Sequence, residues 1–298
     1  MKQLLFVYNP HSGKGAISAA LSDILCRFTE AGYDVTVHPT SAQRDGQDYI
    51  CSHAKEYDLV VSSGGDGMLH ELFGGILASE TNKPCGYIPS GTVNDFASSL
   101  SIPKVPAEAA DTIVSGNFEQ VDAGCFNGDI FAYVAAFGVF TEVSYSTSQN
   151  LKNTLGFTAY LLEALKNFDL NYFNENTVHA VIKFGGEEIE DDFIFGGFEN
   201  TLSMGGMTNL IPEGAQMNDG LLDAVFIKAP KSIIELQKIE FALVSQNLDS
   251  PYIVTARAPA FEFTANKEID WTLDGEFGGT CGSAVISAKE KAITIAVP

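Results

Sequence analysis

The residues with the clearest chemical potential follow an apolar run in the first quarter of the chain. Gly64–Gly67, with the order Gly-Gly-Asp-Gly, comes after Leu59–Val61 and precedes Met68–Phe73, whose apolar residues have helical spacing. Glycines let successive backbone N–H groups turn toward a ligand, and a helix N-terminus adds positive partial charge. A carboxylate repels phosphate, so Asp66 is expected beside a metal ion or a cationic partner. The turn therefore predicts a site for a nucleotide with Mg²⁺.

Two further glycine-bearing loops follow predicted strands, at Asn9–Gly15 and Pro89–Phe96. Ligands of open parallel sheets bind at the carboxyl ends of the strands, so the three loops are expected to converge. Asn9–Gly15 lacks the G-x-x-x-x-G-K-[ST] spacing, which disfavours ordinary P-loop chemistry. A strand-to-helix turn needs glycine for its own geometry, so each loop alone is equally consistent with a structural role. Three of them together favour a phosphate site.

Two patterns of secondary structure must position these loops. The first ~125 residues alternate buried strands with helices, which predicts an α/β domain with a parallel sheet. The strands are expected at residues 4–8, 33–38, 59–62 and 85–88, and helices at residues 17–31, 92–100 and 106–116. After Asp122 helical periodicity appears once, at residues 155–168, and the rest alternates with period two, which predicts an antiparallel β-sandwich or barrel. The short strands are expected at residues 177–184, 192–197, 221–227, 260–264, 269–273, 284–288 and 292–297.

The domain boundary is placed near residue 124. We expect an α/β domain at residues 1–124 and a β-sandwich at residues 125–288. The sequence leaves open whether the last strand, at about residues 289–298, returns to the first domain. The acidic run Glu187–Asp192 is expected at a solvated hairpin end and is assigned no function.

Composition narrows the functional class. The chain has 298 residues, 45% of them hydrophobic, and a formal net charge of −21, which disfavours a broad nucleic-acid-binding surface. Contact with an anionic membrane would need a local basic or apolar patch. The five cysteines are scattered without a C-x-x-C pair, which argues against a disulfide scaffold or zinc and favours a reducing cytoplasm. No apolar stretch reaches the ~20 residues of a transmembrane helix.

The motifs resemble a known family. Asn9-Pro10-x-Ser12-Gly13, Gly64-Gly65-Asp66-Gly67 and Gly91-Thr92-x-Asn94-Asp95-Phe96-Ala97 are similar to segments of the bacterial soluble diacylglycerol kinases, whose relatives include sphingosine and ceramide kinases. The resemblance continues in order through Lys152-Asn153-x-Leu155-Gly156, Asn218-Asp219-Gly220 and Asp274-Gly275-Glu276. The chain departs from the family at Met68, where Thr is usual, and at Ser98, where Arg is common.

The resemblance implies roles for individual residues in the first domain, which it makes a nucleotide-binding domain. It implies ATP contacts at Asn9, Pro10, His11, Ser12, Gly13, Thr40, Gly65, Asp66, Gly67, Met68, Leu69, His70, Glu71 and Thr92. It also implies that Asp66, Asp95 and Asp122 form a water-linked acidic cluster that organises the Mg²⁺ carried by ATP. For Asp122, a strand-end turn residue is an equal alternative.

In the second domain, which would bind the lipid substrate, the resemblance implies that Glu276 is the general base. A carboxylate can accept the proton that the acceptor hydroxyl loses during phosphoryl transfer. From the residues alone, an exposed hairpin glutamate would be favoured. The resemblance further implies a structural metal bound by the Asp219 carboxylate and the carbonyl oxygens of Gln216 and Leu221, although Asn218–Gly220 is equally a good tight turn.

The expected function is that of an ATP-dependent lipid kinase, with diacylglycerol converted to phosphatidic acid in a cleft between the domains. We expect a cytoplasmic enzyme that contacts the bilayer transiently and binds no nucleic acid, and the resemblance suggests a homodimer. Lys14, Lys152 and Lys166 are candidate membrane-side cations, with solvated lysines as the alternative. Two other functions stay open: an NAD kinase, which shares Gly-Gly-Asp-Gly, and a nucleotide- or lipid-binding homologue with reduced or no catalysis.

Overall fold

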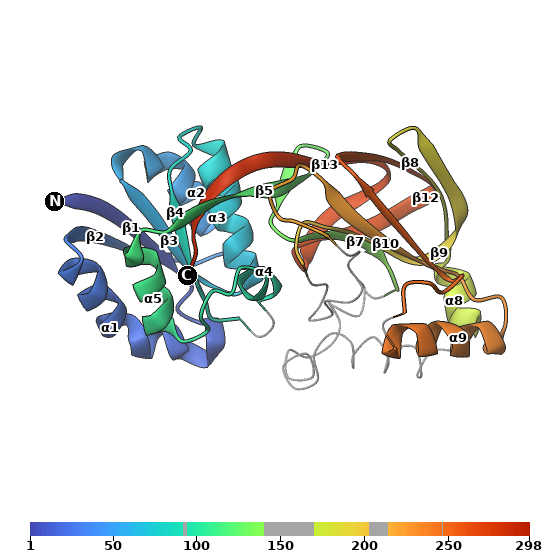
Figure 1. Ribbon diagram of the computed structural model, residues 1–298, viewed down its shortest axis with the longest axis horizontal. Helices are drawn as coiled ribbons and strands as arrows, with labels where there is room; N and C mark the ends of the chain where they lie inside the picture. Colours follow the sequence, from blue (N-terminus) through green and yellow to red (C-terminus); the bar gives the residue numbers. More distant parts are fainter. Residues whose placement is uncertain (92–93, 140–169, 203–213, 246) are drawn as a thin grey trace. The chain divides into compact units, whose positions relative to one another are not determined.

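The computed structural model describes residues 1–91, 94–139, 170–202, 214–245 and 247–298. These residues form two compact units (Figure 1). Unit 1 comprises Met1–Ala123, Ile130–Ala132 and Lys289–Pro298, and unit 2 comprises Gly124–Asp129 and Tyr133–Ala288. Thr92, Lys152, Lys166 and the expected helix at residues 155–168 lie outside the described residues.

Unit 1 is built on parallel strands. β1 (Lys2–Tyr8) pairs in parallel with β2 (Tyr33–Pro39) and with β3 (Leu59–Gly64). β3 pairs in parallel with β4 (Cys85–Pro89), and β4 pairs with the end of β13 (Glu276–Ala296) at Cys85 and Ile295. β3 and β4 are buried along their whole lengths, as expected for parallel strands covered on both faces. The buried hydroxyls of Ser62 and Ser63 in β3 donate to Met68 O and Ile88 O. The carboxyl ends of β1, β3 and β4 therefore lie at one edge.

Helices cover both faces of these strands. α1 (Ala16–Glu30) packs with α5 (Pro106–Ser115), and α2 (Asp45–His53) packs with α3 (Asp66–Ala78) on the other side (Figure 1). The two latter helices approach closely because α3 carries glycine at the contact: a Cβ on Gly75 would lie 2.7 Å from Ile50 Cβ. The helix expected at residues 92–100 is shorter, since α4 (Asp95–Ser99) begins only after Asn94. Two 3₁₀ turns complete the unit, at Ser12–Gly15 and Ala54–Glu56.

Unit 2 is an antiparallel arrangement around aromatic side chains. Its strands are β7 (Val134–Gly138), β8 (Val178–Phe184), β9 (Glu187–Glu199), β10 (Leu222–Lys228), β11 (Ile253–Ala258), β12 (Ala260–Leu273) and the first part of β13. β9 and β12 are long, and each pairs with β8 along one half and with β7 along the other. These pairings form a closed circuit of four strands. Trp271, which is fully buried, contacts Phe137, Phe198 and Phe263 within it.

Several elements differ from expectation. The strands expected at 260–264 and 269–273 form the single strand β12, which a register shift interrupts. Those expected at 284–288 and 292–297 both belong to β13. The acidic run Glu187–Asp192 starts directly after the hairpin turn at Gly185–Gly186, with Glu187 and Glu188 exposed as expected, and continues as part of β9. Glu188 pairs with Lys183 at 3.4 Å and Asp191 with Lys228 at 2.7 Å.

Further elements were not expected. They are β7 and β11, described above, and β5 (Phe118–Phe126), β6 (Asp129–Phe131), α8 (Leu170–Asn176) and α9 (Ile233–Val244). Ser232 caps the N-terminus of α9, where its Oγ accepts a hydrogen bond from Glu235 N at 3.2 Å. Its apolar residues occupy two opposite faces, which hides the helical period. Within the described part of the chain, every helix is too short or too polar to span a bilayer.

Candidate active site

The three glycine-bearing loops of unit 1 lie together. Ser90 Oγ donates to Ser12 Oγ at 2.8 Å, which joins the third loop to the first. The backbone N–H of Ser90 donates to Gly64 O at 2.8 Å, and that of Asn9 donates to Ser63 O at 3.0 Å, so the end of β3 holds both neighbours. The expected convergence is therefore present, and hydrogen bonds of backbone and small hydroxyl groups maintain it.

The closest approach between two of these loops is possible only for glycine. A Cβ on Gly91 would lie 2.7 Å from Gly65 Cα, well inside van der Waals contact. Asn94, whose φ of 55° lies in the left-handed region, holds the third loop through its side-chain amide. Its Oδ1 accepts from Gly91 N at 3.0 Å and its Nδ2 donates to Gly91 O at 2.8 Å. The two loops thus meet through their backbones, with Asn94 holding the Gly91 peptide in place.

Asp66 begins α3 directly after this contact. Burial, and then the negative charge of Asp66, raise the pKa of Tyr87 well above its usual range. The Tyr87 hydroxyl donates to Gly64 O at 2.9 Å, so the phenol lies beneath the glycine turn and Asp66 lies near it. Gly65, Gly67 and His70 are partly exposed, whereas the side chains of Met68 and Leu69 are buried.

Met68 packs over Gly64, which has no side chain to oppose it. The Met68 side chain, which stands where Thr is usual, is therefore buried in the core of unit 1. Because the side chains of Met68 and Leu69 are both buried, a nucleotide could contact only their backbone atoms. In the first loop, Asn9, Pro10 and Ser12 are partly exposed and His11 is exposed. His11 N donates to Asn9 Oδ1 at 2.9 Å, and Gly13 lies in the 3₁₀ turn that follows.

Asp95 and Asp122 are both buried. Asp95 is 4% exposed at the first residue of α4. Asp122, fully buried in β5, accepts a hydrogen bond from Lys291 N at 2.6 Å and so links β5 to β13. No group of three His, Cys, Asp or Glu side chains among the described residues could hold a metal ion.

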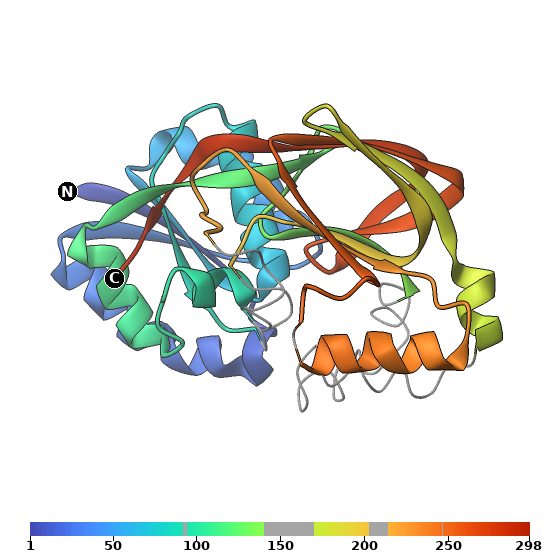
Figure 2. The same cartoon turned by 45° about the vertical axis from the view of Figure 1, so that its right-hand side comes forward.

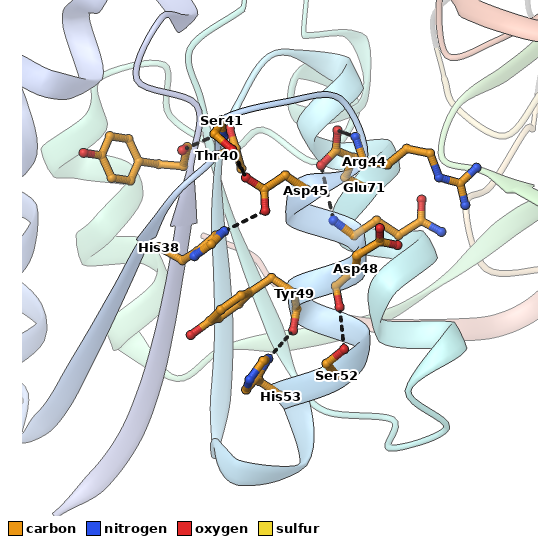
Figure 3. A network of polar contacts seen from close by, with 12 residues as sticks. His38, Thr40, Ser41, Arg44, Asp45, Asp48, Tyr49, Ser52, His53 and Glu71 are labelled. Atoms are coloured by element: carbon orange, nitrogen blue, oxygen red, sulfur yellow. Dashed lines mark hydrogen bonds and ion pairs between the residues drawn. The ribbon is translucent and has the colours of Figure 1, made fainter.

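Thr40 and Glu71 form part of a polar network around α2 (Figure 3). Glu71 accepts from the backbone N–H groups of Arg44 at 2.9 Å and Gln47 at 3.2 Å, at the start of α2. Thr40 N donates to Tyr8 O at 2.9 Å. Asp45 accepts from Ser41 N at 2.7 Å and pairs with His38, and these contacts lower the pKa of Asp45. Glu71 therefore anchors a helix, a role that the sequence analysis missed.

Glu276 stands at the start of β13 in unit 2, and its side chain is exposed. The preceding residues, Asp274 and Gly275, have φ of 52° and 82°, as in the tight hairpin turns that favour Asp-Gly. Asp274 is 3% exposed, and its Oδ1 accepts from Tyr133 N at 2.8 Å and Val134 N at 3.1 Å. The buried Asp274 thus fixes the turn that carries Glu276, and the Asp-Gly pair was the signal for it.

Comparison with known proteins agrees with this arrangement. Residues 3–126 match the diacylglycerol kinase catalytic domain. The chain is 30% identical over 281 residues to a diacylglycerol kinase of Bacillus subtilis (strain 168), covering 94% of this chain and 91% of that protein. It is 32% identical over 292 residues to one of Staphylococcus haemolyticus (strain JCSC1435), covering 95% and 84%.

The chain belongs to the diacylglycerol kinase family. A crystal structure of a Bacillus anthracis str. Sterne protein assigned as a diacylglycerol kinase superposes with a TM-score of 0.86 at 25% identity, covering 100% of this chain and 95% of that one. The resemblance inferred from the motifs is thereby confirmed, as are a mixed α/β N-terminal region and a sheet-based C-terminal region.

One site implied by family resemblance is arranged differently here. Asp219 Oδ1 accepts from Leu221 N at 3.0 Å, and Oδ2 pairs with the Arg257 guanidinium. Arg257 also donates to Gly214 O at 3.0 Å and lies 3.6 Å from Asp223, which is buried. Burial, with the charge of Asp219, raises the pKa of Asp223 to about 6, although Arg257 opposes this.

Both carboxylate oxygens of Asp219 therefore have partners, and Gln216 is exposed on the same turn. A guanidinium supplies the positive charge that a metal would bring to this carboxylate. The turn as arranged fits Arg257 and does not fit a metal ion, so no role is assigned to a metal there.

Proposed function

We propose that the protein transfers the γ-phosphoryl group of ATP to the free hydroxyl of diacylglycerol, producing phosphatidic acid and ADP. The observation that carries this proposal is the convergence of three glycine-bearing loops in a chain whose similarity to diacylglycerol kinases extends over 94–95% of its length. Unit 1 would bind Mg·ATP through the loop backbones and Ser12, and unit 2 would bind the lipid.

The proposed chemistry needs one proton acceptor and an electrostatic cradle. The acceptor hydroxyl forms a bond to the γ-phosphorus while the bond to the β,γ-bridging oxygen breaks, and ADP leaves. Glu276 would take the hydroxyl proton, which its exposed position on a rigid turn allows. Asp66 would orient the waters of the nucleotide-borne Mg²⁺, and Asp95 and Asp122 would support it through water.

A kinase assay with labelled ATP tests this proposal. We expect label to enter diacylglycerol in mixed micelles, with at least 100-fold slower turnover in Glu276→Gln and in Asp66→Asn. Glu262→Gln, an exposed glutamate of β12, is the matched control and should keep wild-type turnover. Full activity in either site variant would refute the role of that residue.

The same assay separates the alternative functions. Label entering NAD and no lipid would show an NAD kinase, since Gly-Gly-Asp-Gly occurs in both families. ATP binding without turnover on diacylglycerol, monoacylglycerol, phosphatidylglycerol or sphingoid bases would show a binding protein. Buried Met68, which leaves no hydroxyl at this position, is the observation that keeps the second alternative in the test.

A further inference from the structure

α9 is apolar on two opposite sides. Leu236, Ile239, Ala242 and Leu243 are buried in the core of unit 2, together with Phe173, Ile194 and Val225. On the other side Ile233, Ile234, Phe241 and Val244 are 63%, 65%, 71% and 58% exposed. At 3.6 residues per turn, these four side chains fall within an arc of about 100°. The exposed Gln237 falls within the same arc. A helix that buries one apolar side and still exposes large apolar side chains on the opposite side is normally covered there by another apolar phase.

This concentration is specific to α9. Eight large hydrophobic side chains are exposed among the residues that the structure describes, and four of them lie on this one helix. The remainder are scattered at Met1, Val105, Phe277 and Val285. Figure 2 shows α9 along one side of unit 2, where its full length can be followed. Single exposed apolar residues are ordinary, but a clustered patch marks a contact surface.

An open groove of about 490 Å³ adjoins this patch, between α9 and the segment at residues 247–252. Ile234, Phe241, Pro251 and Tyr252 give it apolar walls, and Lys238 and Asn247 contribute polar groups. The chain as a whole is acidic, with a net charge of −21, so Lys238 supplies positive charge at the groove against the overall balance. The carboxylate of Asp249 also lines the groove and limits the attraction of this surface to anionic headgroups. An apolar surface with a single ammonium beside it matches a lipid layer with its phosphate headgroups.

The size of the patch distinguishes a bilayer from a second copy of the chain. Four side chains that are about two-thirds exposed present on the order of 450 Å², compared with about 800 Å² per partner in a stable protein interface. Insertion into lipid needs no such area, because a few apolar side chains give reversible attachment. We propose that α9 docks the protein on the lipid bilayer, with its four exposed apolar residues entering the acyl layer and Lys238 at the level of the phosphates. This inference deepens the proposed lipid kinase function and rests on it.

Vesicle binding without ATP tests the docking surface separately from catalysis. We would sediment the protein with phosphatidylcholine vesicles containing diacylglycerol, with and without phosphatidylglycerol. Ile234→Asn combined with Phe241→Gln is expected to weaken binding at least tenfold and to slow turnover on vesicles, with turnover on short-chain diacylglycerol in solution unchanged. Val285→Asn, an exposed apolar residue of β13 at 53% exposure, is the control and should bind normally.

Tryptophan fluorescence gives a second measurement of docking, and this measurement does not depend on a variant that binds more weakly. Trp271 is the only tryptophan of the chain and is fully buried, so Phe241→Trp introduces a reporter on α9. Its emission should shift to the blue on addition of vesicles and be quenched by brominated acyl chains, whereas Val285→Trp should not respond.

The docking surface would be overturned if the wild-type protein did not bind vesicles, or if the double variant bound them as tightly as the wild type. It would also be overturned if the double variant were a monomer, the wild type a dimer, and vesicle binding were retained. The last would assign the patch to a second copy of the chain. Failure of the kinase proposal is distinguishable, because it would appear as absent turnover on soluble and vesicular diacylglycerol alike, whatever the binding result.

Discussion

The two units hold their candidate site residues by different means. In unit 1, the loops after β1, β3 and β4 are held by backbone hydrogen bonds, small hydroxyl groups and the contact of Gly65 with Gly91. In unit 2, the turns that carry Glu276 and Asp219 are held by buried or ion-paired side chains, Asp274 and Arg257. Unit 1 therefore positions its loops through the backbone, whereas unit 2 presents side chains from turns whose position depends on a buried carboxylate, Asp274, and a guanidinium, Arg257.

Replacing the buried anchor of unit 2 should have the largest effect. Asp274→Ala removes the acceptor of two backbone N–H groups and places Ala at a φ of 52°, so we expect a loss of about 3 kcal/mol in unfolding free energy. Displacement of Glu276 should lower kcat about 100-fold. Denaturant unfolding and the lipid kinase assay measure both. Asp274→Asn is the control, since Asn tolerates this φ and keeps an acceptor. Wild-type kcat in Asp274→Ala would show that Glu276 does not depend on the turn.

Arg257 is the second anchor of unit 2, and we expect the stability of its turn to depend on this charge and not on a bound metal ion. Arg257→Met leaves the buried Asp223 without its cation and should cost about 2 kcal/mol, reduced from the value for a fully buried pair because Arg257 is partly exposed. Adding Asp223→Asn should recover part of the loss. Thermal unfolding of the wild-type protein should be the same with EDTA and with Mg²⁺. A lower Tm in EDTA would instead show a metal at Asp219.

Unit 1 should be sensitive to backbone spacing. Gly91→Ala brings a Cβ to 2.7 Å from Gly65 Cα and should cost about 2 kcal/mol, with weaker ATP binding. The matched variant is Gly65→Ala, whose Cβ would lie 3.4 Å from Gly91 Cα, an ordinary contact. Thermal unfolding compares the two. Equal losses of stability in the two variants would mean that the loops can move apart to accept a Cβ at Gly91, and would contradict this prediction.

Glu71 is the exception in unit 1, because a side chain does the anchoring. Glu71→Gln keeps an acceptor and loses the charge at the start of α2, so we expect about 1 kcal/mol less stability. The KM for ATP should change less than threefold. A tenfold rise in KM at unchanged stability would instead place Glu71 on the nucleotide, as the family resemblance implies.

Local sequence was enough to find most of unit 1. β1 and β3 contain short apolar runs, Leu4–Tyr8 and Leu59–Val61, and β4 is buried along its length, and the chemistry of each loop lies within a few residues of the strand before it. In unit 2, local patterns found β8 and β10 but missed or divided other elements. α9 was missed because apolar residues on both its faces leave no helical period, and β12 and β13 were each divided because bends and register shifts interrupt the alternation.

The sequence by itself determined the order of motifs, the family and the loops that form the candidate nucleotide site, because each depends on residues close in the chain. Only the tertiary structure decided which partners those residues have. Asp122 meets Lys291 across 169 positions, Asp274 meets Tyr133 across 141, and Arg257 meets Asp219 across 38. Such pairs leave no local pattern, since the pairing of strands brings them together and their contact depends on burial and geometry that no single segment encodes.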